Sequence, residues 1–399
     1  MQRSGYGYLL SVNPSRYIYP RSSSAPRAPI ILPEDILRSV VHQLSPWDDS
    51  NHTTLRNLAG LSQVLNHVST PLLYCSPYSS LDTLAKLRRF LRTLKFSPHL
   101  ALLVREYKVP REGDLRKIPT KEVKPFWETL ARALPRTRNL VILRFCAYPS
   151  CPYTTLRLED CTFPHLRVLN WLALNNSELW GFLERHPNLT SIDLTWPWLD
   201  PQNYDRLQQE CSRPQILPAL KYLCSDLRRL EMFLPNRDVR RIRWRPPLDW
   251  EPQITPALMR TLSNIHWMWL DLDVDEQFKD LMPLIGGCLD NLQVLRLGVL
   301  WENDDLEGLI QHLPELRRLI FFDEDMSFED AQEKAHSLFQ VGHTNLNHVD
   351  IAIEEVFLFH QFCRTIPAVR AHRRIPNGQV NVRYEGTIVL EDDWMELVE

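Results

Sequence analysis

Arginine and tryptophan side chains alternate along two neighbouring segments in the second half of the chain. Arg241, Arg243 and Arg245 occupy every second position, and Trp267 and Trp269 show the same spacing in the next segment. Every second residue of a β-strand points to the same side, so each set should project from one face of a sheet. Guanidinium groups pair with carboxylate or phosphate, and arginine and tryptophan are enriched where proteins bind proteins. The pattern therefore predicts a binding surface.

The predicted surface continues between the apolar positions of later segments. The expected substrate-binding residues are Arg241, Arg243, Arg245, Trp267, Trp269, Arg296, Arg318 and Phe322. So many guanidinium groups favour an acidic or phosphorylated peptide as the ligand.

An alternative gives the same residues a structural role. The tryptophans would face a covering helix or loop, and carboxylates that follow the strands would neutralise the arginines. These carboxylates form an acidic rim made of Asp271, Asp273, Asp275, Glu276, Glu302, Asp304, Asp305, Asp323, Glu324 and Asp325. The sequence leaves both possibilities open.

These residues lie within copies of one short apolar phrase. An apolar residue is followed by two variable positions, a second apolar residue, one variable position and a third apolar residue. Copies begin at Leu140, Leu166, Leu189, Ile265, Leu292 and Leu316, with degenerate copies at Leu220, Val239 and Leu346. Starts separated by roughly 19 to 31 residues resemble an irregular leucine-rich repeat. The resemblance implies stacked units of strand and helix that bury one continuous core, with the variable residues on the inner curve of a solenoid.

Composition is that of an ordinary globular protein. The 399 residues are 44% hydrophobic and 24% charged, and the formal net charge is -3. The eight cysteines form no Cys-x-x-Cys pair, so we expect reduced thiols and no metal site. The chain has no phosphate-binding glycine loop, nucleophile elbow or zinc-binding His-Glu-x-x-His motif. We therefore expect a protein that is not an enzyme and holds no cofactor.

Nucleic acid and membrane are not the expected partners. The stretch from Arg228 to Arg245 includes Trp244 and has the basic and aromatic mixture of a nucleic-acid site, but the acidic rim argues against that use. A basic amphipathic helix is expected from Leu81 to Phe96, where a solvated face is the simpler interpretation. No apolar run is long enough to cross a bilayer. The expectation of reduced thiols fits a cytoplasmic or nuclear location.

A small helical module precedes the repeats. Leu32, Ile36, Leu37, Val40, Val41 and Leu44 have helical spacing after Pro33. A second periodic stretch carries Leu55, Leu58, Leu61, Leu65 and Val68 and is expected to end before Pro71. The preceding residues 1–29 contain Arg, Ser, Pro and Tyr but no acidic residue, and we expect a disordered arm or, alternatively, a transit peptide.

The residues of this module resemble an F-box as found in fungal F-box proteins. The likeness rests on Leu32 to Leu37, on Leu61 with Ser62, and on Thr70 to Tyr74. The later segments Leu217 to Leu223 and Leu234 to Val239 resemble repeats of the same group. The resemblance implies that the F-box docks onto a Skp-type adaptor, which joins a cullin and RING subunit, while the repeats hold a protein substrate for ubiquitin transfer. The implied adaptor-binding residues are Leu32, Pro33, Ile36, Leu37, Val40, Leu61 and Leu65.

The expected architecture is α/β, with a short N-terminal helical F-box module followed by an irregular leucine-rich-repeat solenoid. The expected divisions are an arm (1–29), the module (30–75), a linker helix (76–98), the solenoid (99–390) and an acidic C-terminal end (391–399). The expected function is substrate recognition in a Skp-cullin-F-box type ubiquitin ligase. Two alternatives remain: a repeat scaffold that recruits no ligase, and a module that only caps the first repeat.

Overall fold

The computed structural model describes most of the module and of the repeats. The described residues are 33–46, 49–77, 84–108, 120–145, 161–171, 177–194, 213, 215–245, 254–271, 281, 284–299, 306–322, 326–340, 345–352, 365–366, 368–373, 380–381 and 388–389. The expected arm (1–29), Leu32, most of the acidic rim and the acidic end (391–399) lie outside them.

The repeated phrase becomes a parallel sheet whose strands follow one another in chain order. The first ten strands are β1 (Glu106–Lys108), β2 (Ile142–Phe145), β3 (Val168–Trp171), β4 (Ser191–Asp193), β5 (Tyr222–Ser225), β6 (Arg241–Trp244), β7 (Trp267–Leu270), β8 (Val294–Val299), β9 (Arg318–Phe322) and β10 (His348–Ala352). Each pairs in parallel with the next. Every predicted copy of the phrase, the degenerate ones included, contributes a strand. Of these ten strands, only β1 was not predicted.

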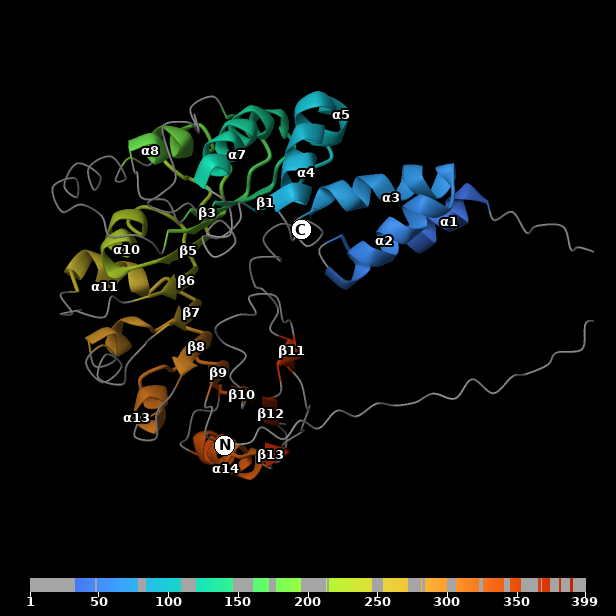
Figure 1. Ribbon diagram of the computed structural model, residues 1–399. Coiled ribbons are helices and arrows are strands. Elements are labelled where there is room, and N and C mark those ends of the chain that lie inside the picture. Colours follow the sequence, from blue (N-terminus) through green and yellow to red (C-terminus); the bar gives the residue numbers. More distant parts are fainter. Residues whose placement is uncertain are drawn as a thin grey trace, which may run out of the picture.

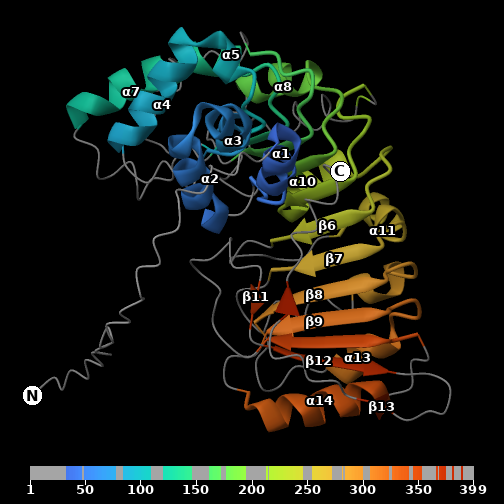
Figure 2. The same cartoon turned by 90° about the vertical axis from the view of Figure 1, so that its right-hand side faces the viewer.

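Short helices lie on the outer side of the curved sheet (Figure 1). They are α7 (Thr120–Ala133), α8 (Ser177–Glu184), α10 (Leu227–Phe233), α11 (Pro256–Leu262) and α13 (Leu306–Gln311), with 3-10 turns η2 (Leu134–Arg136) and η5 (Gly286–Cys288). Strands β6 to β9 stack one below another in the turned view (Figure 2). Parallel strands joined by outer helices make the fold α/β, as expected.

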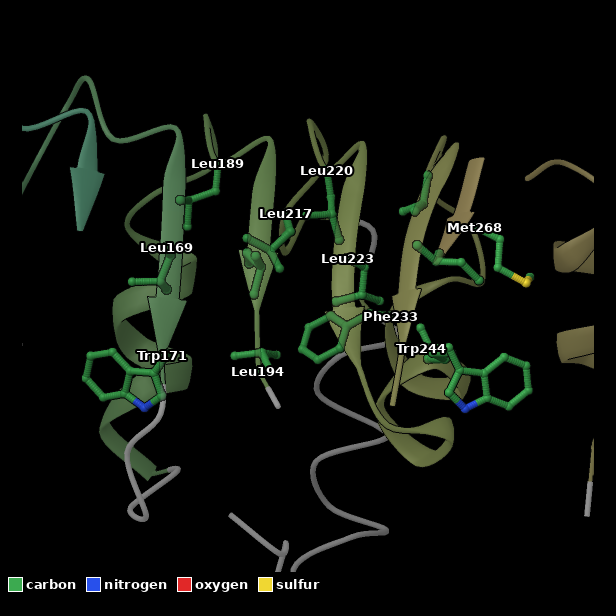
Figure 3. Close-up of a cluster of buried hydrophobic side chains, with 14 of the residues drawn as sticks. Leu169, Trp171, Leu189, Leu194, Leu217, Leu220, Leu223, Phe233, Trp244 and Met268 are labelled. Carbon is green, nitrogen blue, oxygen red and sulfur yellow. The ribbon is translucent and has the colours of Figure 1, made fainter. Parts of the chain in front are cut away.

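The core lies between the sheet and these helices. Leu143, Leu169 and Ile192 hold equivalent positions on β2, β3 and β4, and all three are fully buried. Figure 3 shows how Leu169, Leu223 and Met268 face the same interior from successive strands. A fully buried leucine contributes roughly 1.5 to 3 kcal/mol. Stability therefore accumulates from one strand to the next.

Asparagine side chains join successive turns where the chain enters the strands. Their amide groups donate to backbone carbonyl oxygens of the preceding unit: Asn139 to Leu102 (2.7 Å), Asn188 to Pro164 (3.4 Å), Asn291 to Ser263 (2.7 Å) and Asn345 to Pro314 (2.8 Å). Each bond satisfies a turn carbonyl that has no strand partner. The asparagines therefore fix the stacking of one unit on the next.

The parallel order ends after β10. Strand β12 (Ala368–Arg373) pairs antiparallel with β10, and β13 (Val380–Asn381) pairs antiparallel with β12. Strands β11 (Thr365–Ile366) and β14 (Ile388–Val389) form a separate antiparallel pair. Helix α14 (Phe328–Gln340) contacts both β10 and β12. The end of the expected solenoid therefore departs from the repeat.

The N-terminal module consists of three helices rather than the two expected. They are α1 (Glu34–His42), α2 (Asp49–Leu61) and α3 (Gln63–Cys75). The second periodic stretch breaks at Ser62, whose extended backbone and hydroxyl cap α3 by accepting from the Leu65 N–H at 3.2 Å. Pro71 lies inside α3, so the expectation that the helix ends before it was wrong. Val41, Leu55 and Val68 form a small core of their own.

The module is joined to the sheet at the end of α3. The Ser76 hydroxyl donates to Glu106 at 2.7 Å in a buried position, and the Arg105 N–H donates to the Cys75 carbonyl at 2.9 Å. Helix α4 (Leu84–Phe96), expected as a linker, packs Leu91 and Leu94 into the large core, and the short helix α5 (Pro98–Ala101) follows. Figure 1 shows α1 to α3 projecting from this end of the sheet.

Candidate functional site

The inner face of the sheet carries the predicted arginines and tryptophans in two rows. Arg241 pairs in register with Trp267, and Arg243 pairs with Trp269. The residues between them, Ile242 and Met268, are fully buried in the core. The alternation expected from the sequence is therefore the alternation of the structure.

Asp271 holds two of the arginines. One oxygen of its carboxylate accepts from Arg243 Nη2 at 2.7 Å and from Arg245 Nε at 2.5 Å. Burial raises the pKa of Asp271, but the two guanidinium groups outweigh burial and hold the pKa below its ordinary value. The carboxylate stays ionised and neutralises part of the cluster, as the structural alternative supposed.

Trp269 lies between two guanidinium groups. The guanidinium carbon of Arg243 is 3.2 Å from the centre of its ring, and that of Arg296 on β8 is 3.7 Å away. Both contacts are cation-π interactions, which are strongest where water is excluded. Trp269 therefore orders the arginines from neighbouring strands, which the sequence did not indicate.

A second carboxylate and arginine pair lies further along the same face. Asp350 on β10 is fully buried and accepts from Arg318 Nε at 2.9 Å and from Arg318 Nη2 at 2.7 Å. The Arg318 side chain keeps 33% of its surface exposed. The ion pair of Asp350 with Arg318 was not predicted, because the spacing of the repeat indicates only that Asp350 lies on the inner face.

The remaining predicted substrate-binding residues differ in how far their side chains are exposed to solvent. Trp267 is only 8% exposed, and its ring centre lies 6.2 Å from that of Tyr222. Arg241 is half-buried. Phe322 is a strand residue paired with Ala352, and its side chain is outside the described part of the structure. The buried Trp267 offers little surface to a partner, which again agrees with the structural alternative.

The helical module carries exposed apolar side chains on each of its three helices, which together we call its apolar face. Of the eight exposed large apolar side chains in the described residues, four belong to the module: Ile36 (49%), Val40 (57%), Leu61 (72%) and Val64 (40%). Ile36 and Val40 are one turn apart on α1, while Leu61 and Val64 flank the break between α2 and α3. An apolar surface of this kind marks sites that bind other proteins.

The predicted adaptor-binding residues divide into exposed and packed ones. Pro33, Ile36, Val40 and Leu61 are exposed. Leu37 is half-buried, and Leu65 packs against the small core. Leu32 lies outside the described residues. Val64 is also exposed, but it was not among the predicted residues.

Three further observations on the described residues concern disulfides, metal sites and membrane spans. Among the described cysteines, Cys75, Cys161, Cys224 and Cys288 are not joined in disulfides. The described side chains include no group of three or more histidine, cysteine or acidic residues able to hold a metal ion. Within the same residues, no helix combines the length and apolarity needed to span a membrane.

Comparisons with known proteins give structural similarity alone. No protein-family profile matches the chain, and no curated protein matches it in sequence. Among solved structures, the complex of TLR13 with ssRNA13 is similar with a TM-score of 0.31 and 13% identity over 48% of this chain. The leucine-rich-repeat protein LIC12759 of Leptospira interrogans is similar with a TM-score of 0.26 and 15% identity over 61% of this chain. The chain spans 30% and 56% of the length of these two proteins.

Proposed function

We propose that this chain is the substrate-recognition subunit of a Skp-cullin-F-box type ubiquitin ligase. The module from residue 30 to 75 would be an F-box that docks a Skp-type adaptor, and the leucine-rich repeats would bind a protein substrate. The chain would perform no catalysis itself, because the cullin and RING subunits would supply the ubiquitin-transfer machinery. It would act in the cytoplasm or nucleus.

The observation that carries the adaptor half is the exposed apolar face of Ile36, Val40, Leu61 and Val64. These side chains belong to helices that have a separate core, so they are not needed to hold the module together. A few apolar anchors at the centre of an interface usually dominate its binding energy. The face therefore suits a groove on a helical partner.

The substrate half rests on the arginine cluster of the inner face. Arg243, Arg245 and Arg296 bring three positive charges to one region, and Asp271 and Asp193 contribute two negative charges against them. Arg245 and Arg318 each keep about a third of their side chains exposed, at 32% and 33%. This excess of positive charge favours an acidic or phosphorylated ligand, which we propose to be a protein.

Co-purification with a Skp-type adaptor tests the proposal. Val40→Asp places a charge in the centre of the proposed interface, and we expect adaptor capture to fall by at least about tenfold, because a buried unpaired charge is costly. The matched control is Leu284→Asp, since Leu284 is similarly exposed (41%) but lies outside the module. Equal capture by the wild-type protein and by Val40→Asp would remove the adaptor half of the proposal.

The scaffold without ligase recruitment is the second candidate. It is favoured by the buried bond between Ser76 and Glu106, which gives the module a structural role at the end of the sheet. In that case the full-length protein would fold normally and no Skp-type adaptor would bind it at any concentration near the physiological range.

A further inference from the structure

The edge of the sheet where the strands begin carries a row of exposed basic side chains. The row consists of the residue immediately before each strand from β1 to β10. Its members are Arg105, Val141, Arg167, Thr190, Lys221, Arg240, His266, Gln293, Arg317 and Asn347. We name its five exposed Arg and Lys residues, Arg105, Arg167, Lys221, Arg240 and Arg317, the basic edge.

The row is ordered because it continues the hydrogen-bonded ladder. Each backbone N–H donates to the carbonyl oxygen of the previous member; for example, the Arg167 N–H donates to Val141 at 2.8 Å and the Arg317 N–H donates to Gln293 at 2.8 Å. The backbone positions of the basic residues are therefore fixed relative to one another. Their side chains reach solvent from a rigid frame.

The basic edge carries a local excess of positive charge. Of the ten described positions in the row, none is acidic, whereas the whole chain has a formal net charge of -3. Asp238 pairs with Arg240 at 3.0 Å, and both side chains are more than half exposed. Pairs this exposed are weak, so a ligand can compete for Arg240.

The length of the basic edge fits an extended segment of polypeptide. Strand spacing is about 4.8 Å, so the eight steps from β1 to β9 cover about 38 Å, a span that about 12 residues of extended peptide also cover. Lys221 and Arg240 lie on adjacent strands, and Arg105, Arg167 and Lys221 are two strands apart. A peptide whose carboxylates recur along its length would meet successive basic side chains.

We propose that the basic edge binds an acidic segment of a partner protein in an extended conformation. Four of its five residues are arginines, whose forked donors match carboxylates. The described row contains no Phe, Tyr or Trp on which unpaired bases would stack. This surface is separate from the inner face, and it reaches the module at Arg105, whose N–H donates to the Cys75 carbonyl.

The experiment measures binding of a fluorescein-labelled Glu-Ser alternating peptide, about 12 residues long to match the span, to the full chain. The edge variant combines Arg167→Glu, Lys221→Glu and Arg317→Glu. We expect saturable binding that weakens with salt and falls at least about tenfold in the edge variant, because three attractive contacts become repulsive. The corresponding Gln-Ser peptide should not bind.

The matched control reverses three exposed charges on α4 and α7, with Arg89→Glu, Arg92→Glu and Lys124→Glu. Both variants should keep the wild-type melting temperature and adaptor binding, and the control should bind the acidic peptide within about twofold of wild type. Equal weakening by the two variants, or no peptide binding at all, overturns the proposal. An oligonucleotide, single-stranded or duplex, that binds the wild-type chain more tightly than the acidic peptide and loses this binding in the edge variant would identify nucleic acid as the ligand. That result would also overturn the proposal.

Discussion

At the scale of single residues, the carboxylates on the inner face decide how much of the arginine cluster is already neutralised. Asp271 accepts from Arg243 and Arg245 with one oxygen, and Asp350 accepts twice from Arg318. The inner face is therefore partly self-paired. An acidic substrate must add to these pairs or displace them, so the partly exposed arginines are the ones that can respond to it.

Asp271→Asn should lower the free energy of unfolding by about 2 kcal/mol, because two partly buried guanidinium groups lose their shared counter-charge. Urea unfolding measures the change. The control is Asp238→Asn, which removes a carboxylate from a pair at the exposed surface and should have a much smaller effect. Equal effects would show that the Asp271 pairs do not stabilise the fold.

Lowering the pH should destabilise the fold through His186. This buried side chain accepts from the Phe163 N–H through Nε2 at 3.0 Å and donates from Nδ1 to the Phe182 carbonyl at 2.6 Å, which requires the neutral ring. Burial holds the pKa of His186 below its ordinary value of 6.5. As the pH drops below about 6.5, His186 is protonated in the unfolded chain but stays neutral in the folded chain. The free energy of unfolding therefore decreases as the pH is lowered.

The measurement is urea unfolding of wild type and His186→Gln at pH 7.5 and at pH 5.5, values chosen to lie about one unit either side of the ordinary histidine pKa. The fall in stability between the two should be larger for wild type. His99→Gln, which changes an exposed histidine, should behave like wild type. An identical pH dependence in all three proteins would contradict the role of His186.

At the scale of elements, the asparagine bonds between successive turns hold the stack together. Asn291→Ala should lower the free energy of unfolding by about 1 to 2 kcal/mol, because the Ser263 carbonyl loses its donor. Asn264→Ala is the control, since Asn264 has the same place before an apolar residue but its side chain makes no hydrogen bond within the described residues. Comparable losses in the two variants, measured by thermal melting, would count against the asparagine bond.

The positions and direction of the strands were predictable because they depend on local spacing. The apolar residues of each phrase must be buried, and this requirement places Ile242 and Met268 inward and Arg243 and Trp269 on the opposite face. The contacts among the inner-face side chains were not predictable. The stacking of Arg243 and Arg296 on Trp269 depends on which strands become neighbours, and the phrase alone does not specify the rotamers.

In the helical module, the boundaries of the helices could not be predicted from local spacing. Helical spacing correctly predicted α1, but the period continued through Ser62 and concealed the break between α2 and α3. A serine that can cap a helix is a weak signal within an apolar period, because tertiary packing decides whether the cap is used.

At the scale of the whole molecule, two cores of very different size are joined through the end of α3. The module core contains Val41, Leu55 and Val68, whereas the core of the sheet extends from α4 to β10. Small cores give marginal stability. We expect backbone amides of α1 to α3 to exchange with solvent faster than those of β5 to β8.

Hydrogen exchange followed by mass spectrometry measures this difference directly. Adding a Skp-type adaptor should slow exchange in α1 and α3, because a partner that binds only the folded module stabilises it. The amides of β5 to β8 provide the internal control and should not change. Exchange in the module as slow as in those strands, without adaptor, would contradict the picture of two unequal cores.

The central claim is that the exposed apolar face of the module docks an adaptor. Isothermal titration of a purified Skp-type adaptor into the full chain tests it most directly, with the double variant Ile36→Asp and Val40→Asp alongside the Leu284→Asp control. The proposal predicts saturable one-to-one binding to the wild-type protein and to the control, and loss of binding in a double variant that remains folded. Absence of binding to wild type, or equal binding to the double variant, would contradict it.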